Sequence, residues 1–280
     1  MKYRRSIAYI VLNTVKWVFL ICLLAVALLP LVWLIVSSFR TNLELQVSPF
    51  GLPSKLQWNN YAKAFAMASL PRLFLNSIIV SVCAVFLNIT VTAMASFILS
   101  REHFRGRDLI HTILTAGVLI PVISFMVPYF TLVTKTHLYN KLIALVLVYS
   151  AVNIPVSIFL VTAFMKSIPR ELEEASIIDG CGFFQRFSKI IFPLSRSGLV
   201  TAGTFCFIYA WNEFLMAMLL TSSLESRTIQ LGIKFFTSQF ITDYGSMYAA
   251  IVVTIIPSVV AYIFLHDKII GGLTAGAVKG

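Results

Sequence analysis

The chain has 280 residues and a net charge of +11, and 59% of its residues are hydrophobic while only 12% are charged. Soluble chains carry about 45–50% apolar and about 25% charged residues. The mean hydropathy of +0.89 therefore excludes a disordered chain, a disulfide scaffold and an ordinary cytosolic enzyme. It predicts an all-α integral membrane protein, because lipid requires satisfied backbone groups and the alternation of barrel strands is absent.

Six apolar segments predict six transmembrane helices. Five contain no charged residue and one contains only Glu213, and the segments are 17–36, 73–99, 109–133, 142–165, 198–220 and 247–265. Each is long enough for a bilayer core, which needs about 20 apolar residues in a helix. The first segment could be mistaken for a signal peptide, but its apolar run continues well past residue 27, so we interpret it as a retained helix.

The basic residues predict the orientation of these spans. Six spans place both termini on one side, and the segments on that side hold 14 Lys and Arg residues against 8 on the other side. Because basic residues accumulate in cytoplasmic loops, we expect both termini in the cytoplasm.

Two loops are long: residues 40–72 outside and residues 166–197 inside. The inner loop predicts a short helix with an acidic first turn that stops at Gly180. A second helix follows, which Pro193 ends or bends, with one apolar face formed by Phe183, Phe187, Ile190, Ile191 and Leu194. Such a helix pair suits docking to another protein, and an amphipathic helix lying on the lipid surface is the alternative.

Polar residues within the spans are candidates for function. Glu213 is the only carboxylate in a span, so it either lines a translocation path or makes a structural hydrogen bond. Trp211 and Asn212 share this ambiguity, and Asn76 and Asn88 also fit hydrogen bonding between helices. The four cysteines have no CxxC spacing and the four histidines are scattered, so no metal site is expected.

Several segments resemble the permeases of ABC importers. Residues 174–176, Asp179, Gly180, Phe187, Ile190 and residues 193–194 are similar to the EAA loop of that family, with departures at Ser176, Cys181 and Ser197. Residues 74–77 and 211–214 fit the same family. The C-terminal residues 271–280 are similar to the tail of the smaller permease in maltose-type sugar importers, and the resemblance covers the whole chain.

The resemblance implies a type I ABC importer permease fold. The chain then divides into an N-terminal helix with its external loop (1–71), a core of five helices (72–266) that includes the EAA loop (166–197), and a cytoplasmic tail (267–280). The loop implies a coupling helix in a cleft of an ATPase, and the residues expected to contribute are Glu173, Glu174, Ala175, Ser176, Asp179, Gly180, Phe183, Phe187 and Pro193. Asn76, Trp211, Asn212 and Glu213 are the candidates for the translocation path.

The resemblance also implies partners. This chain has no Walker A sequence, so it is expected to bind no cofactor, and ATP and Mg would lie in a separate ATPase dimer. The other expected partners are a second homologous permease forming a heterodimer, an external solute-binding protein, an oligosaccharide or related sugar and the lipid bilayer of a bacterial or archaeal cell membrane, with no nucleic acid. The tail is expected to be ordered only by the ATPase, and a disordered terminus is the alternative.

Three other functions remain as alternatives. A permease for a non-sugar solute would share the whole pattern. An integral-membrane enzyme is disfavoured because neither an HExxH nor a GxSxG motif is present. A self-sufficient secondary transporter is disfavoured by the single intramembrane acid.

Overall fold

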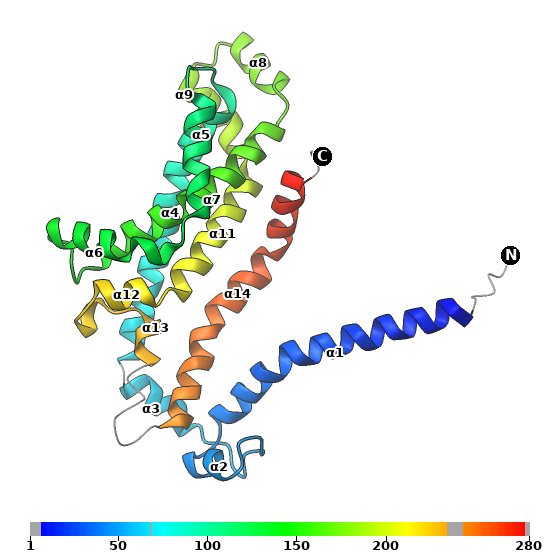
Figure 1. The fold of residues 1–280 in the computed structure, drawn as a ribbon, viewed down its shortest axis with the longest axis vertical. Coiled ribbons are helices and arrows are strands. Elements are labelled where there is room, and N and C mark those ends of the chain that lie inside the picture. The colour runs from blue at the N-terminus through cyan, green and yellow to red at the C-terminus, as the bar shows by residue number, and fades with distance from the viewer. Residues whose placement is uncertain (1–6, 68, 234–242, 278–280) are drawn as a thin grey trace. The chain divides into compact units, whose positions relative to one another are not determined.

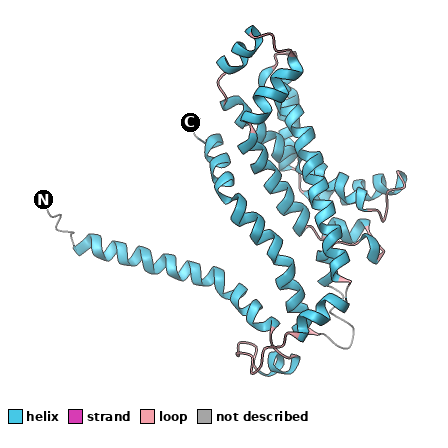
Figure 2. Cartoon of the chain, turned by 180° about the vertical axis from the view of Figure 1, so that it is seen from behind, coloured by secondary structure: helices cyan, strands magenta, loops and turns pink. Residues whose placement is uncertain are grey.

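The structure is a computed structural model that describes residues 7–67, 69–233 and 243–277. These residues form helices and loops, and none of them is in a strand (Figure 2). The chain divides into two compact units, one made of Met1–Ala68 with Ile233–Val253 and the other of Ser69–Gly232 with Thr254–Gly280. The all-helical prediction is confirmed.

The first unit begins with α1 (Ile7–Ser38), which includes the first predicted span. It continues with α2 (Asn42–Val47), α3 (Asn59–Met67) and the first residues of α14 (Tyr244–Ala277). Thr41 and Glu44 form a capping box that starts α2: the Thr41 hydroxyl accepts the N–H of Glu44, and the Glu44 carboxylate accepts the N–H of Thr41.

The second unit is built on α4 (Leu70–Arg101), α7 (Leu142–Ser167) and α11 (Arg196–Asn212), which pack against one another. Asn88 lies fully buried in this packing, where its amide donates to the carbonyl of Ser150 at 3.0 Å and accepts from the Ser157 hydroxyl at 2.8 Å. The prediction that Asn88 joins helices by hydrogen bonds is confirmed.

The third predicted span is not one straight helix. Residues 109–133 lie in α5 (Arg107–Ala116), η1 (Gly117–Leu119), η2 (Val122–Phe125) and α6 (Met126–Lys135), and the two halves differ in direction by 102°. The break falls at Pro121, which lacks an N–H and cannot continue a helix without distortion. Before the break, Gly117 approaches α7 so closely that a Cβ there would lie 2.8 Å from Cγ of Pro155.

The fifth predicted span ends earlier than expected. The prediction of one helix over 198–220 is wrong at its end, because α11 stops at Asn212 and Glu213 is extended. A new helix, α12 (Leu215–Leu220), then begins, followed by η4 (Leu224–Ser226) and α13 (Ile229–Gly232). The Glu213 carboxylate accepts the N–H groups of Met216 and Ala217 at 2.8 and 3.0 Å, which starts the new helix.

Four helices among the described residues are long and apolar enough to cross a membrane, and they include Val11–Ser38, Leu70–Arg101, Leu142–Ser167 and Tyr244–Phe264. Two bent pairs raise the number to six when each pair is counted as one span. These pairs are Arg107–Leu119 with Val122–Lys135, and Phe183–Leu194 with Arg196–Asn212. The second bent pair turns by 73° between its two helices, and residues 213–220 lie outside it.

The predicted tail begins without a break in the backbone. Helix α14 continues to Ala277, so residues 267–277 of the predicted tail are helical, and ordering of the tail by an ATPase stays a prediction. Residues 278–280, the end of that tail, lie outside the described residues.

Candidate functional site

The loop of residues 166–197, here called the coupling loop, forms the predicted helix pair. Its first helix is α8 (Glu171–Ile178), and its second part consists of α9 (Phe183–Gln185), η3 (Arg186–Ile191) and α10 (Phe192–Leu194). Within the second unit, α8 and α9 lie at the same end as α5, beyond the end of α7 (Figure 1).

Gly180 ends α8 as the sequence predicts. The N–H of Cys181 donates to the carbonyl of Ser176 at 2.9 Å, and the N–H of Gly180 donates to the carbonyl of Ile177 at 3.0 Å. These two bonds define a Schellman motif, which requires a left-handed residue after the helix. Gly180 supplies it with φ of +84°, and a Cβ at this position would meet nothing within 4 Å in this chain.

The apolar face of the second part differs from the prediction. Ile191 is fully buried and Phe187 and Ile190 are half-buried, but Leu194 is exposed and Ser195 is buried in its place. The cause is η3, which is a π-helix. Its wider turn holds more residues than an α-turn and rotates the following side chains, so Leu194 leaves the apolar face.

Three of the predicted coupling residues face the chain itself. Glu173 and Ser176 are buried, and Phe187 packs its ring 5.3 Å from that of Phe97 on α4. Glu173 accepts a hydrogen bond from Arg186 at 2.6 Å and lies 3.7 Å from Arg101. Neither arginine was predicted as a partner of Glu173. Arg101 lies more than 60 residues before the loop, and no local pattern links the two.

The other predicted coupling residues are exposed, and they are Glu174, Ala175, Asp179, Gly180, Phe183 and Pro193. Large apolar side chains lie exposed among them: Ile178 is 86% exposed and Phe184 is 71% exposed, and Leu172 and Ile177 are also exposed. The end of α8 and the start of α9 therefore present apolar and acidic side chains together, as a surface that docks on another protein does.

The four candidates for the translocation path differ in their burial. Trp211 is buried, donates to the carbonyl of Thr254 at 3.0 Å and packs against the ring of Phe74. Asn76 is buried and donates to the carbonyls of Glu225 and Arg227. Both side chains thus make their hydrogen bonds inside the chain, and their place on a translocation path stays a prediction.

Asn212 and Glu213 are less buried. Asn212 is exposed, and its amide bonds to the Ile208 carbonyl at 2.8 Å. Glu213 is half-buried and accepts from the Tyr149 hydroxyl at 2.8 Å as well as from the start of α12. The geometry fits the structural alternative for Glu213, whereas Asn212 retains an accessible amide.

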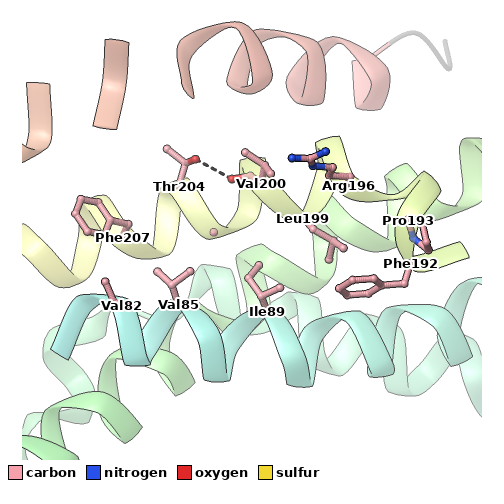
Figure 3. A pocket seen from close by; sticks show the side chains of 11 residues that line it. Val82, Val85, Ile89, Phe192, Pro193, Arg196, Leu199, Val200, Thr204 and Phe207 are labelled. Atoms are coloured by element: carbon pink, nitrogen blue, oxygen red, sulfur yellow. Dashed lines mark hydrogen bonds between the residues drawn. The ribbon is translucent and has the colours of Figure 1, made fainter. Parts of the chain in front are cut away.

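A groove of about 610 Å³ runs between α4 and α11 (Figure 3). Its lining is mostly apolar and includes Val82, Val85 and Ile89 from α4. Phe192 and Pro193 lie at one end, and Arg196 is the charged residue of the lining. The Thr204 hydroxyl in the wall already donates to the carbonyl of Val200 at 2.7 Å. Sugar binding needs several free hydrogen-bonding groups, so the groove does not have the chemistry of a sugar site.

Among the described residues, no group of three His, Cys, Asp or Glu side chains is placed to hold a metal ion. The acidic side chains of the coupling loop instead pair with arginines or face outward.

The membrane-length helices define a multi-pass membrane protein, and the exposed helix pair of the coupling loop lies at one end of its second unit (Figure 1). Residues 88–267 match the family of binding-protein-dependent transport system inner membrane components, and the chain belongs to this family. It is therefore a transport permease of the ABC importer class rather than an enzyme.

Relatives and solved structures agree with this family. The chain is 33% identical to the diacetylchitobiose uptake system permease protein NgcG of Streptomyces coelicolor, over 91% of this chain and 85% of that protein. It is 32% identical to the trehalose transport system permease protein SugB of Mycobacterium tuberculosis, over 99% of each. A bacterial ABC transporter involved in the import of the acidic polysaccharide alginate contains a chain with the same fold, with a TM-score of 0.83, 22% identity and coverage of 94% of this chain and 98% of that one.

Proposed function

We propose that this chain is the permease subunit that carries a sugar, an oligosaccharide, from an external binding protein into the cytoplasm. Transport proceeds by alternating access driven by a separate ATPase. The observation that carries the proposal is the exposed apolar and acidic surface at the end of α8, held in place by the Gly180 turn. The names of NgcG and SugB, which concern diacetylchitobiose and trehalose, support a saccharide.

The proposed assembly contains four kinds of partner. A second, homologous permease completes a heterodimer, an ATPase dimer binds ATP and Mg, a solute-binding protein delivers the sugar and the bilayer surrounds the helices. This chain itself binds no cofactor. Both termini and the coupling loop lie in the cytoplasm of a bacterial or archaeal cell, which agrees with the excess of basic residues on that side.

A substitution at Gly180 tests the docking. Gly180→Leu and Gly180→Ala carry the same left-handed strain, but only leucine adds bulk toward the partner. Gly106→Leu is the matched control, because Gly106 has φ of +87°, also faces open space and lies outside the coupling loop. We expect Gly180→Leu to abolish ATP-driven uptake at normal membrane abundance, while Gly180→Ala and Gly106→Leu retain it.

Uptake is measured in proteoliposomes that contain both permeases, the ATPase and the binding protein. The radiolabelled probes are diacetylchitobiose, trehalose and alginate oligosaccharides. Normal uptake by Gly180→Leu would contradict the docking proposal, and uptake of none of the saccharides by the native complex would contradict the sugar assignment.

Single-cysteine labelling tests the orientation. In a variant without the native cysteines, Lys55→Cys should react with an impermeant maleimide added outside the cell, and Gln185→Cys should not. Both side chains are exposed, so accessibility within the chain does not differ. The reverse labelling pattern would overturn the orientation and the coupling role together.

A further inference from the structure

Four charged side chains from separate parts of the second unit meet behind the coupling loop. Glu173 on α8 accepts from Nη1 of Arg186 on η3 at 2.6 Å, and Nη2 of the same arginine donates to Glu102 at 3.0 Å. Arg101, the last residue of α4, lies with Nε 3.7 Å from Glu173. Two positive and two negative charges therefore form one balanced cluster.

Two members of this cluster are buried, so each buried charge needs its oppositely charged partner. The residues Arg101 and Glu173 are each only 7% exposed, and a buried charge is tolerated only when it is paired. Arg101 also donates through Nη2 to the carbonyls of Met165 and Ile168, which lie at the end of α7 and just after it. One guanidinium thus joins the ends of α4 and α7 to the carboxylate on α8.

An aromatic contact lies beside the ionic one. Phe97, one turn before Arg101 on α4, is buried with its ring 5.2 Å from that of Phe183 and 5.3 Å from that of Phe187. The guanidinium of Arg186 lies 5.6 Å from the centre of the Phe183 ring. The coupling loop therefore contacts the end of α4 through both ion pairs and aromatic packing.

The covalent chain connects α8 to α7 and, through η3 and α10, to α11, but it leaves α4 without a direct link. We propose that Arg101, Glu102, Glu173 and Arg186 form an ionic latch that makes α8 and the end of α4 one rigid body. This inference rests on the proposed function, in which the ATPase displaces α8. The latch then passes that displacement to α4 as well as to the helices on either side of the loop. These four side chains are positioning residues that act through α8 and touch no substrate.

A distance measurement in the full chain tests the latch without any partner. Spin labels at Ile98→Cys on α4 and Glu171→Cys on α8 occupy exposed positions, and the chain is placed in lipid nanodiscs with its native cysteines replaced. Pulsed electron resonance should give one narrow distance for the native latch. Arg186→Gln should lose that narrow distance and give a broad distribution, because both bridges from η3 are removed.

Lys189→Gln is the matched control, since it makes the same change of charge on the same η3 helix at an exposed position. It should keep the narrow distance. If Arg186→Gln prevents folding, Glu102→Gln removes only the more exposed bridge, and it should broaden the distance as well. An unchanged narrow distance in a folded Arg186→Gln or Glu102→Gln chain would overturn the latch.

The assembled complex then tests the transmission of movement. The complex with Arg186→Gln should still hydrolyse ATP, but the amount of sugar taken up per ATP hydrolysed should fall. Arg186→Lys should recover part of this ratio, because it keeps the charge at one bridge. A purely structural role would lower the amount of complex and leave the ratio unchanged, which would overturn the proposal. Failure of the proposed function is distinguishable, because it abolishes uptake by the native complex while the nanodisc distances stay as expected.

Discussion

Two buried arginines, one in each unit, are stabilised in different ways. Arg40, which is 1% exposed, donates to the carbonyls of Glu44, Ser48 and Pro49 at 2.6, 2.6 and 3.1 Å. None of the described carboxylates forms an ion pair with it. Arg101 also donates to two carbonyls but lies beside the buried carboxylate of Glu173.

The difference lies in how far along the chain the partners are. The partners of Arg40 all fall within nine residues of it, so this arginine shapes a single loop. Those of Arg101 lie more than 60 residues away, at the end of α7, just after it and on α8. A local arginine fixes the form of its own loop, whereas a distant one makes separate helices depend on each other and can pass a movement between them.

The largest effect is expected from a substitution of Glu173, which pairs with Arg101 and Arg186. Glu173→Gln leaves Arg101 without its carboxylate in a buried place, which costs about 3–5 kcal/mol of unfolding free energy. Unfolding of the purified chain by SDS titration measures it. Glu174→Gln, an exposed neighbour on the same helix, should change stability by less than about 0.5 kcal/mol. Equal stability of the two variants would mean that Arg101 does not depend on Glu173.

A smaller and more local effect is expected from Arg40→Ala. The three carbonyls lose their donor, at a cost of about 1–3 kcal/mol for each acceptor that stays buried. Because the partners are local, residues 40–58 should become sensitive to protease while α1 and α3 remain intact. Lys55→Ala, an exposed residue of the same loop, should leave the cleavage rate unchanged. Loss of the whole fold in Arg40→Ala would contradict the local role.

Glu213 provides a further contrast, because it combines local and distant partners. Glu213→Gln weakens its bonds to the Tyr149 hydroxyl and to the N–H groups that start α12, and we expect a loss of about 1.5 kcal/mol. Tyr149→Phe removes only the distant bond and should cost less. Uptake per molecule should stay normal in both variants. A specific loss of uptake in Glu213→Gln at full abundance would return Glu213 to the translocation path.

The same division explains what the sequence could predict. The spans were predictable because length and apolarity are properties of one segment. The Gly180 turn was predictable because an acidic helix start and a glycine stop are also local signals. The coupling residues were expected from the resemblance to the EAA loop.

What the sequence could not predict depends on distant contacts or on register. Pro121 is a local cause of a bend, but the 102° turn is also accompanied by close packing of Gly117 on Pro155 in another helix. The end of α11 depends on Glu213, one of whose partners is on α7. The π-helical turn of η3 moved Leu194 off its face, and helical spacing alone does not show such a turn. Arg101 and Arg186 pair with Glu173 only in the folded chain.

The smallest effect is expected from protonation of Glu44 in the loop of residues 40–58. Hydrogen bonds from the Ser54 hydroxyl, and then from the N–H groups of Thr41 and Ser54, lower the pKa of Glu44 from its ordinary 4.5 to about 2. A lowered carboxyl pKa means that the stabilisation is complete above the unfolded pKa of 4.5 and is lost as the pH falls through about 2. Pepsin should therefore begin to cut residues 40–58 only near pH 2. Ser54→Ala removes the main donor and should move this onset to higher pH, whereas Ser48→Ala, whose hydroxyl makes no bond to Glu44, should not. The same onset in Ser54→Ala and the native chain would show that Glu44 does not hold the loop.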